Sequence, residues 1–101
     1  MSVTCTEENR HLTAALSGEL DHHAAKVIMS TLDTQIDTAM PAALTLDLSA
    51  LTFTDSSGIA VLLRVWRHMN RLGGSMRVIH VPTQADKVFR AAGLHRIIPF
   101  E

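Results

Sequence analysis

The chain has 101 residues, of which 47% are hydrophobic, and a formal net charge of −1. This length predicts a single domain over residues 1–101 with a two-layer core, and the lack of a basic excess argues against a general nucleic-acid binder. One cysteine, Cys5, excludes an internal disulfide, and the longest apolar run, residues 59–63, is too short to span a membrane. Because the first residues also lack a signal-peptide pattern, the sequence predicts a cytoplasmic protein without a membrane partner.

The first predicted elements are two strands that pair as a hairpin. Residues 3–6 have a short strand pattern that contains Cys5, a thiol with no basic neighbour to activate it and therefore predicted to be structural and inert. After a polar turn, residues 12–17 alternate apolar with small or polar side chains, the period of a strand with one buried face. Gly18 is predicted to end this strand.

A helix is predicted over residues 21–39, with Asp21 as its N-cap and Pro41 beyond its end. The apolar residues at helical spacing, expected to face the core, are Ala24, Val27, Ile28, Leu32 and Ile36. Residues 44–48 then alternate as another strand, from which Leu51 and Phe53 lead into a loop.

The strongest helix signal covers residues 57–72 and ends at Gly73-Gly74, which is typical of a left-handed C-terminal cap. Its predicted core residues are Ile59, Leu62, Leu63, Trp66 and Met69. Its polar stripe consists of Arg64, Arg67, His68 and Arg71. We interpret this stripe as a solvated face, with contact to an acidic partner surface as the alternative.

The last third of the chain is predicted to hold two strands and one helix. Residues 76–81 form a strand that includes His80 as a partly buried ring and that Pro82 stops. Residues 83–86 have the form of a capping box and open a short helix, which Gly93 ends before a last strand over residues 96–100. The resulting order, ββαβαβαβ, predicts the α/β class, with a mixed, mostly parallel sheet and helices packed on it.

The segment with the most chemical potential is Asp55-Ser56-Ser57-Gly58, between a strand and the start of a helix. Free backbone N–H groups and the helix dipole favour negative charge there, so a phosphoserine at Ser56 is compatible with the helix. Asp and Ser before an apolar run are also the ordinary composition of an N-cap, which is the alternative role of Ser56. Gly58 is interpreted as leaving room for the backbone of another molecule.

Enzymatic and metal sites have little support in the sequence. The Gly-x-Ser-x-Gly pattern of serine hydrolases is absent, which leaves a small hydrolase using Ser56 or Ser57 as a weak alternative. None of the six histidines has His-x-x-x-His spacing, and the adjacent His22 and His23 point apart on a helix. The sequence therefore predicts no enzyme, no metal site and no cofactor.

Two further stretches are informative together. Residues 16–23 read LSGELDHH, and residues 46–59 read LDLSALTFTDSSGI. In this order and spacing they resemble STAS domains of the anti-sigma factor antagonist type: the first is similar to the segment between their second strand and first helix, the second to their phosphorylation segment. RLGG at residues 71–74 and AGL at 92–94 fit as well. The resemblance covers essentially the whole chain and is closest to the anti-sigma-F-factor antagonists of bacterial sporulation, with the general-stress antagonists next.

The resemblance implies a switch protein whose unphosphorylated form binds a serine kinase that is also an anti-sigma factor, so that the sigma factor is released. The kinase phosphorylates the first serine after the aspartate, which here is Ser56, and a partner phosphatase reverses this. The implied partner-binding residues are Asp21, His22, Asp55, Ser57, Gly58 and Ile59. A scaffold-type STAS module of a stress-signalling assembly, without phospho-switching, is the alternative. The sporulation members continue into another helix beyond the last strand, whereas this sequence ends at Glu101.

Overall fold

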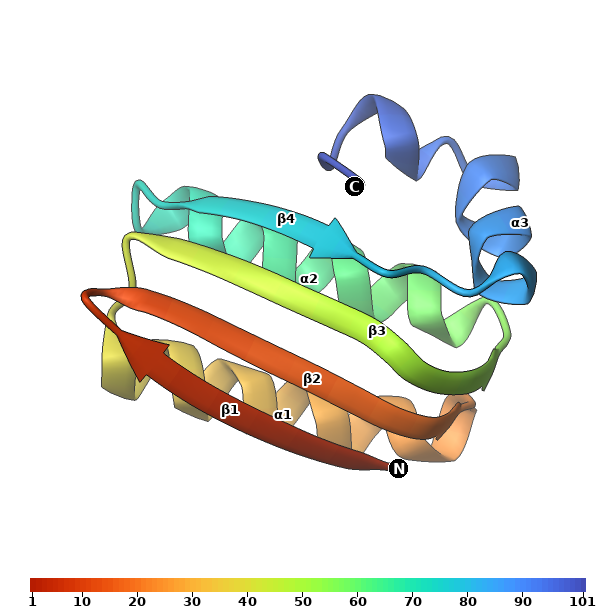
Figure 1. The fold of residues 1–101 in the computed structure, drawn as a ribbon, viewed down its shortest axis with the longest axis horizontal. Coiled ribbons are helices and arrows are strands. Elements are labelled where there is room, and N and C mark those ends of the chain that lie inside the picture. The colour runs from red at the N-terminus through yellow and green to blue at the C-terminus, as the bar shows by residue number, and fades with distance from the viewer.

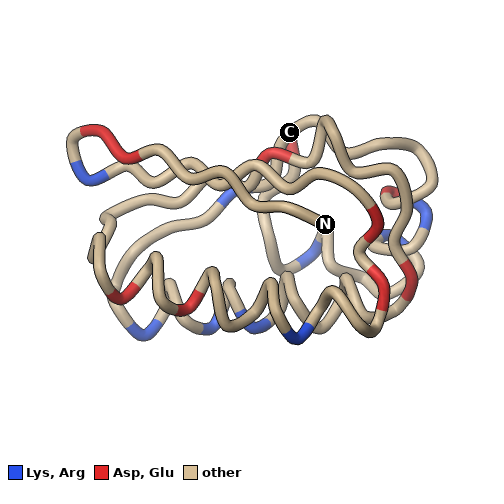
Figure 2. The backbone as a smooth tube through the Cα atoms, turned by 90° about the horizontal axis from the view of Figure 1, so that it is seen from below, with Lys and Arg blue, Asp and Glu red and all other residues tan.

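The computed structural model describes residues 1–101 and shows two layers, a four-stranded sheet and a pair of helices on one of its faces (Figure 1). The strands are β1 (Ser2–Glu8), β2 (His11–Leu20), β3 (Ala43–Thr54) and β4 (Ser75–Ile79). The helices are α1 (His22–Ala39), α2 (Ser57–Arg71), α3 (Thr83–Ala91) and the short 3-10 helix η1 (Leu94–Arg96). Seen edge-on, α1 and α2 lie side by side beneath the sheet, and the β1–β2 hairpin extends past them at one end (Figure 2). None of the helices is both long and apolar enough to cross a bilayer.

The strand order β1-β2-β3-β4 confirms the predicted α/β class with a mixed, mostly parallel sheet. β1 pairs with β2 antiparallel, as expected of the hairpin, whereas β2–β3 and β3–β4 are parallel pairs. Each parallel pair is joined through a helix, α1 in the first case and α2 in the second. Both connections therefore cross the same face of the sheet, which brings α1 and α2 into contact.

The core lies between the sheet and these two helices. It is built mainly from leucines at alternate positions of β2 and β3, which are fully buried. From α1 it takes Ala25, Ile28, Leu32 and Ile36, and from α2 Val61, Leu62, Val65 and Met69. Cys5 of β1 packs against the core at its margin, and burial raises the pKa of its thiol.

Both buried helix faces differ from the predicted stripes. Val27 is 65% exposed, and Ala25 takes the place beside the sheet. On α2, the residues Ile59, Leu63 and Trp66 are only partly buried, because the helix is turned by one position from the expected face. Residues 59–63 are all apolar, so the sequence contains two overlapping stripes of the same period, and packing against α1 decides between them.

β2 and β3 are longer than predicted. Gly18 bends β2 and does not end it: it adopts φ +99°, beside shifts in the β2–β3 register, and the strand continues to Leu20. β3 continues with it, so that Gly18 pairs with Leu51 and Leu20 with Thr54. The residues expected in a loop, Leu51 and Phe53, therefore belong to the strand, with Phe53 42% exposed.

The predicted last strand is wrong over most of its length. Residues 94–96 form η1, and only Phe100 makes a bridge to Val78, next to the hydrogen bond from the Val78 N–H to the Pro99 carbonyl (2.9 Å). Pro99 lacks the N–H that a full ladder requires, and the turn after Gly93 uses up the preceding residues. The observed order is thus ββαβαβα followed by η1.

Two other expectations near β4 are also wrong, and one is confirmed. His80 lies beyond the strand, at φ 56°, with an exposed ring. The predicted capping box does not form, since α3 begins after Pro82 and its N-cap makes no side-chain hydrogen bond. The glycine cap of α2 does form: Gly73 has φ 74°, and the Gly74 N–H reaches back to the Met69 carbonyl at 2.9 Å.

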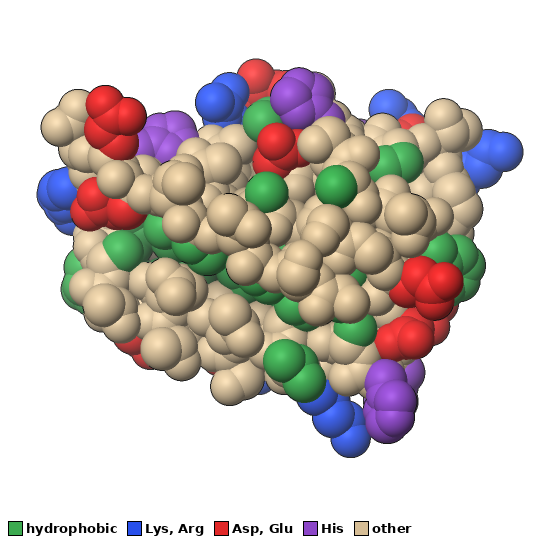
Figure 3. Space-filling view, turned by 60° about the horizontal axis from the view of Figure 1, so that its bottom comes forward, with side chains coloured by type: hydrophobic (Ala, Val, Ile, Leu, Met, Phe, Trp, Pro, Cys, Tyr) green, Lys and Arg blue, Asp and Glu red, His purple; other side chains and the backbone are tan.

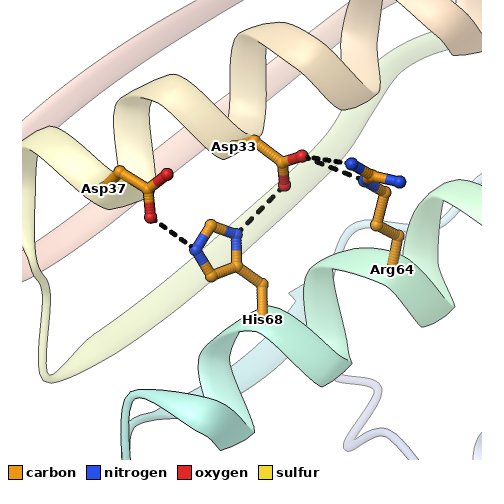
Figure 4. A network of polar contacts seen from close by, with 4 residues as sticks. All are labelled: Asp33, Asp37, Arg64 and His68. Atoms are coloured by element: carbon orange, nitrogen blue, oxygen red, sulfur yellow. Dashed lines mark hydrogen bonds and ion pairs between the residues drawn. The ribbon is translucent and has the colours of Figure 1, made fainter.

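A polar network joins α1 to α2 (Figure 4). The Arg64 guanidinium donates twice to one oxygen of Asp33, at 3.0 and 2.7 Å. The His68 ring lies between two carboxylates, with Nδ1 3.0 Å from Asp33 and Nε2 2.7 Å from Asp37. Its side chain is only 8% exposed, so its placement on a solvated face was wrong. Since a carboxylate only accepts, both ring nitrogens must carry hydrogen for both bonds to form.

Asp33 joins Arg64 to His68 in this network, and its ionisation is tied to the fold. Burial by itself raises the pKa of Asp33, but the hydrogen bonds and charges of Arg64 and His68 outweigh it, so the net pKa is lowered. A carboxyl whose pKa is lower in the folded than in the unfolded chain stabilises the fold above the unfolded value, about 3.9. That contribution is lost as the pH falls through the folded pKa.

We predict that Asp33→Asn lowers the free energy of unfolding by about 1 kcal/mol at pH 7, because the substitution removes the charged acceptor of three hydrogen bonds, two from Arg64 and one from His68. The difference from the unmodified chain should shrink in urea titrations as the pH falls below the unfolded value of about 3.9 and through the lowered folded pKa of Asp33. The exposed Glu7→Gln, which touches no partner, is the matched control and should show neither effect. A deficit of Asp33→Asn that persists undiminished at pH 2.5 would contradict this account.

Candidate functional site

The two segments that the sequence singled out meet at the carboxyl edge of the sheet. Leu20, the last residue of β2, pairs with Thr54, the last residue of β3, although they are 34 positions apart. The next residues are Asp21 and Asp55, each of which opens a loop into a helix. Because β2 and β3 are parallel neighbours, the two loops lie side by side, and each leads into the N-terminus of a helix, α1 or α2.

Thr54 fixes this edge through every polar atom it has. Its hydroxyl donates to the Leu20 carbonyl at 3.1 Å and lies at the same distance from the carbonyl of Asp55. Its backbone is bonded in both directions by the Gln84 side chain of α3: the Thr54 N–H donates to Oε1 at 3.0 Å, and Nε2 donates to the Thr54 carbonyl at 2.8 Å. Gln84 thus satisfies the end of β3 where β4 has already finished.

Neither Thr54 nor Gln84 was identified from the sequence. Thr54 lies in a stretch that was predicted to be a loop, and Gln84 lies in a pattern that was interpreted as a cap. Leu51 and Thr54 are buried, and the two residues between them are exposed, so this part of the strand lacks the two-residue period by which a strand is recognised. Thr54 is fully buried, with 0% exposure, but this burial is a property of the fold that the sequence does not reveal.

Asp55, and not Ser56, caps α2. The Ser57 N–H donates to the Asp55 side chain at 2.8 Å, and the Gly58 N–H donates to the Asp55 carbonyl at 3.1 Å. Ser56 has a helical backbone, φ −61° and ψ −16°, and its side chain makes no capping hydrogen bond. The Ser56 hydroxyl is exposed at the N-terminus of α2, where the backbone dipole favours a negative group.

Gly58 has a different role from the one predicted. It is buried, and a Cβ built on it would overlap the Thr54 Oγ1, so its missing side chain lets α2 approach the end of β3. That space is filled by Thr54 and is closed to a second molecule. Glycine is required here by packing inside the chain, and the interpretation of Gly58 as an opening for a partner's backbone was wrong.

The remaining predicted site residues form the rim around Ser56. Asp21 caps α1 as expected, accepting from the Ala24 N–H at 2.8 Å. His22 is exposed beside it, while Ser57 and Ile59 are half-buried. Residues 16–25 and 51–63 contain no Lys or Arg, and acidic side chains gather at this end of the molecule, on the right in Figure 3. The surface around the hydroxyl is therefore acidic, with Phe53 as an exposed apolar neighbour.

The site offers one exposed hydroxyl and a rim of carboxylates. No hydrogen bond joins a histidine to Ser56 or Ser57; four of the six rings bond elsewhere, namely His11, His68, His80 and His95. No group of three or more His, Cys, Asp or Glu side chains has a geometry that could hold a metal ion. The arrangement can accept a modification at Ser56 and present a surface to another protein.

We predict that Asp55→Ala lowers the free energy of unfolding by about 1 kcal/mol, because it removes the side chain that caps α2. Ser56→Ala, one residue away, should change it by less than about 0.5 kcal/mol, since the exposed hydroxyl bonds nothing in the chain. Urea denaturation followed by circular dichroism measures both. If Ser56→Ala were the more destabilising of the two, the cap would be misassigned.

Comparison with known proteins agrees with the geometry. A sequence model of the STAS domain matches residues 2–101. An anti-sigma F factor antagonist from Paenibacillus polymyxa is 35% identical over 88 residues, which is 87% of this chain and 75% of that protein. The solved structure of the anti-sigma factor antagonist SpoIIAA in its unphosphorylated form superposes with a TM-score of 0.84 at 26% identity, covering 99% of this chain and 88% of SpoIIAA. The phosphorylated form from Bacillus gives a TM-score of 0.75 at 26% identity and covers 99% and 91% of the two chains. The chain therefore belongs to the STAS domain family.

Proposed function

We propose that residues 1–101 act as one STAS domain, an anti-sigma factor antagonist of the cytoplasm that phosphorylation of Ser56 switches off. In this proposal the unphosphorylated chain binds an anti-sigma factor that is a serine kinase, and the sigma factor is released. A serine phosphatase reverses the modification. The chain is a regulatory binding protein and has no enzymatic activity of its own. The observation that carries the proposal is the exposed Ser56 hydroxyl, which is left free because Asp55 caps α2.

A free hydroxyl matters because it can be modified without breaking the fold. A phosphate on Ser56 would meet the positive end of the α2 dipole while the capping bond of Asp55 stays intact. The comparison with SpoIIAA supports this: the chain superposes on both the unphosphorylated and the phosphorylated protein over 99% of its length. The scaffold alternative gave Ser56 only a capping role, and Ser56 makes no capping bond.

The proposed partner surface is the edge formed by the two loops. Asp21 and His22 supply its α1 side, and Ser57 and Ile59 its α2 side. Asp55 and Gly58 contribute by holding the end of α2 in place, the first as a cap and the second by close packing. A kinase that phosphorylates Ser56 must cover this edge, because Ser56 is in the loop before α2, which lies beside the loop before α1.

Charge explains how the switch would turn binding off. The edge already carries carboxylates, and residues 16–25 and 51–63 contain no Lys or Arg, so neither loop supplies a side-chain cation to neutralise a phosphate at Ser56. Docking would have to desolvate that dianion next to Asp21 and Asp55. Like charges placed together in an interface cost several kcal/mol, and each 1.4 kcal/mol is about tenfold in affinity. Exclusion by charge and size needs no rearrangement of the sheet or the helices.

The phosphorylation site is tested by incubating the chain with the cognate kinase and ATP. Ser56→Ala should abolish incorporation of phosphate, because it removes the exposed hydroxyl, and Ser57→Ala should still be labelled. Mass spectrometry of the intact chain and of its peptides gives both results. Stoichiometric labelling of Ser56→Ala would disprove the assignment.

The switch itself is tested by affinity. Ser56→Asp should bind the kinase at least about tenfold more weakly than the unmodified chain, while Ser56→Ala should bind normally. Isothermal titration calorimetry measures the affinity, and thermal unfolding should show that both variants keep the stability of the parent. Normal binding by Ser56→Asp, or a phosphorylated chain with a reorganised sheet, would contradict the mechanism.

A further inference from the structure

The outer side of the helix layer has the opposite charge to the phosphorylation edge. Its basic residues are Lys26 on α1 and Arg64, Arg67 and Arg71 on α2; its acidic residues are Asp33 and Asp37, both on α1. Figure 2 shows the Lys and Arg positions along the side of this layer that faces away from the sheet. Both acidic residues are engaged by the network of Arg64 and His68, so the surface as a whole is positive.

A groove lies on this surface between α1 and α2. It has a volume of about 410 Å³ and is lined by Met29, Ala60, Arg64, Arg67 and Arg71. Its lining therefore consists of two apolar side chains and three guanidinium groups, without a carboxylate. Arg67 and Arg71 are exposed and make no ion pair within the chain. The fold therefore gains no stability from an ion pair of Arg67 or Arg71 within the chain.

The third arginine is held in place. Arg64 binds Asp33 through Nε and one terminal nitrogen, and Asp33 is fixed in turn by His68, whose ring is buried. Arg64 is thereby oriented along the wall of the groove before any partner arrives. Ordering a long side chain in advance reduces the entropy lost on binding.

The spacing of the arginines suits a short stretch of polypeptide. Arg64 and Arg71 are two helical turns apart, about 10 Å along the axis at 1.5 Å per residue. In an extended chain, side chains on one face recur about every 7 Å. Two or three carboxylates on alternate residues of such a segment can therefore each reach a guanidinium group of the groove. Small apolar residues between them would meet Met29 and Ala60.

We propose that this groove, lined by Met29, Ala60, Arg64, Arg67 and Arg71, is a docking site for an acidic, extended segment of a partner protein. Charge indicates that the partner is a protein and not a nucleic acid. The chain as a whole carries −1, and three guanidinium groups on one helix are too small a basic surface for a nucleic-acid backbone. The site does not depend on Ser56 and is available whether or not Ser56 is modified.

The probe is a fluorescein-labelled peptide of eight residues with alternating Glu and Ala, and the readout is fluorescence anisotropy on the full chain at low salt. Arg67→Ala/Arg71→Ala should weaken binding at least about tenfold, because it removes two unpaired cations from the groove. Lys87→Ala/Arg96→Ala, which removes two exposed charges elsewhere, is the matched control and should bind like the parent. Arg67→Lys/Arg71→Lys should recover most of the affinity.

Two further measurements test the proposal. Amide chemical shifts should change along residues 60–71 of α2 and not at residues 55–58, both in the parent chain and in Ser56→Asp, so that the result is independent of the proposed switch. A labelled single-stranded oligonucleotide of eight nucleotides should bind more weakly than the peptide. The proposal is overturned if the Arg67/Arg71 and Lys87/Arg96 variants lose affinity equally, or if the oligonucleotide binds more tightly than the peptide.

Discussion

The parallel pairing of Leu20 with Thr54 is the contact on which the functional edge depends. It extends two strands beyond the point where their regular alternation fades, and it brings the loop before α1 against the loop before α2. The Thr54 hydroxyl stabilises this pairing by donating to the Leu20 carbonyl, and the missing side chain of Gly58 lets α2 pack onto Thr54. Without this pairing, Asp21 and Ser56 would belong to separate surfaces.

At this edge, the neighbouring residues Asp55 and Ser56 have separate roles. Asp55 satisfies the free N–H groups at the start of α2, a task that a serine in the same segment could also perform. Because the aspartate performs it, the hydroxyl of Ser56 is available for chemistry at a helix end that already favours an anion. The capping bond and the free hydroxyl therefore belong to adjacent side chains and can change independently.

The two faces of the molecule that lie beside α2 differ in charge. The N-terminus of the helix borders carboxylates, whereas its later turns carry arginines of which only Arg64 is neutralised within the chain. A single helix thus presents an acidic end and a basic flank. A partner that touches both would need the complementary distribution of charge, which restricts its orientation.

Much of this arrangement follows from local sequence. The hairpin, α1 with its Asp21 cap, α2 with its glycine end and the parallel order are set by periodicity and by caps, which act over a few residues. The ends of β2 and β3 were missed because they are stabilised by each other and not by their own alternation. The last strand was overextended because Phe100 packs on Phe89 of α3 and His95 of η1 through its side chain, while Pro99 limits the backbone pairing.

The candidate site shows the same limit. The sequence locates Ser56, but it cannot say whether Ser56 or Asp55 provides the cap, because both residue types suit that role. His68 was placed on a solvated stripe because its partners Asp33 and Asp37 are on another helix, more than 30 positions away. Long-range polar partners leave no periodic trace, and only the packing of α1 on α2 reveals them.

The hydrogen bonds between Gln84 and Thr54 place an unequal restriction on which amino acids each position tolerates. Thr54 contributes its main chain, which every residue except proline could supply equally well. Gln84 contributes a carboxamide, the only uncharged side-chain group that offers a donor and an acceptor side by side, and asparagine would be one methylene too short to replace it at this reach. An otherwise ordinary surface position of α3, far along the chain from Thr54, is therefore restricted to glutamine by the two hydrogen bonds that it makes to the end of β3.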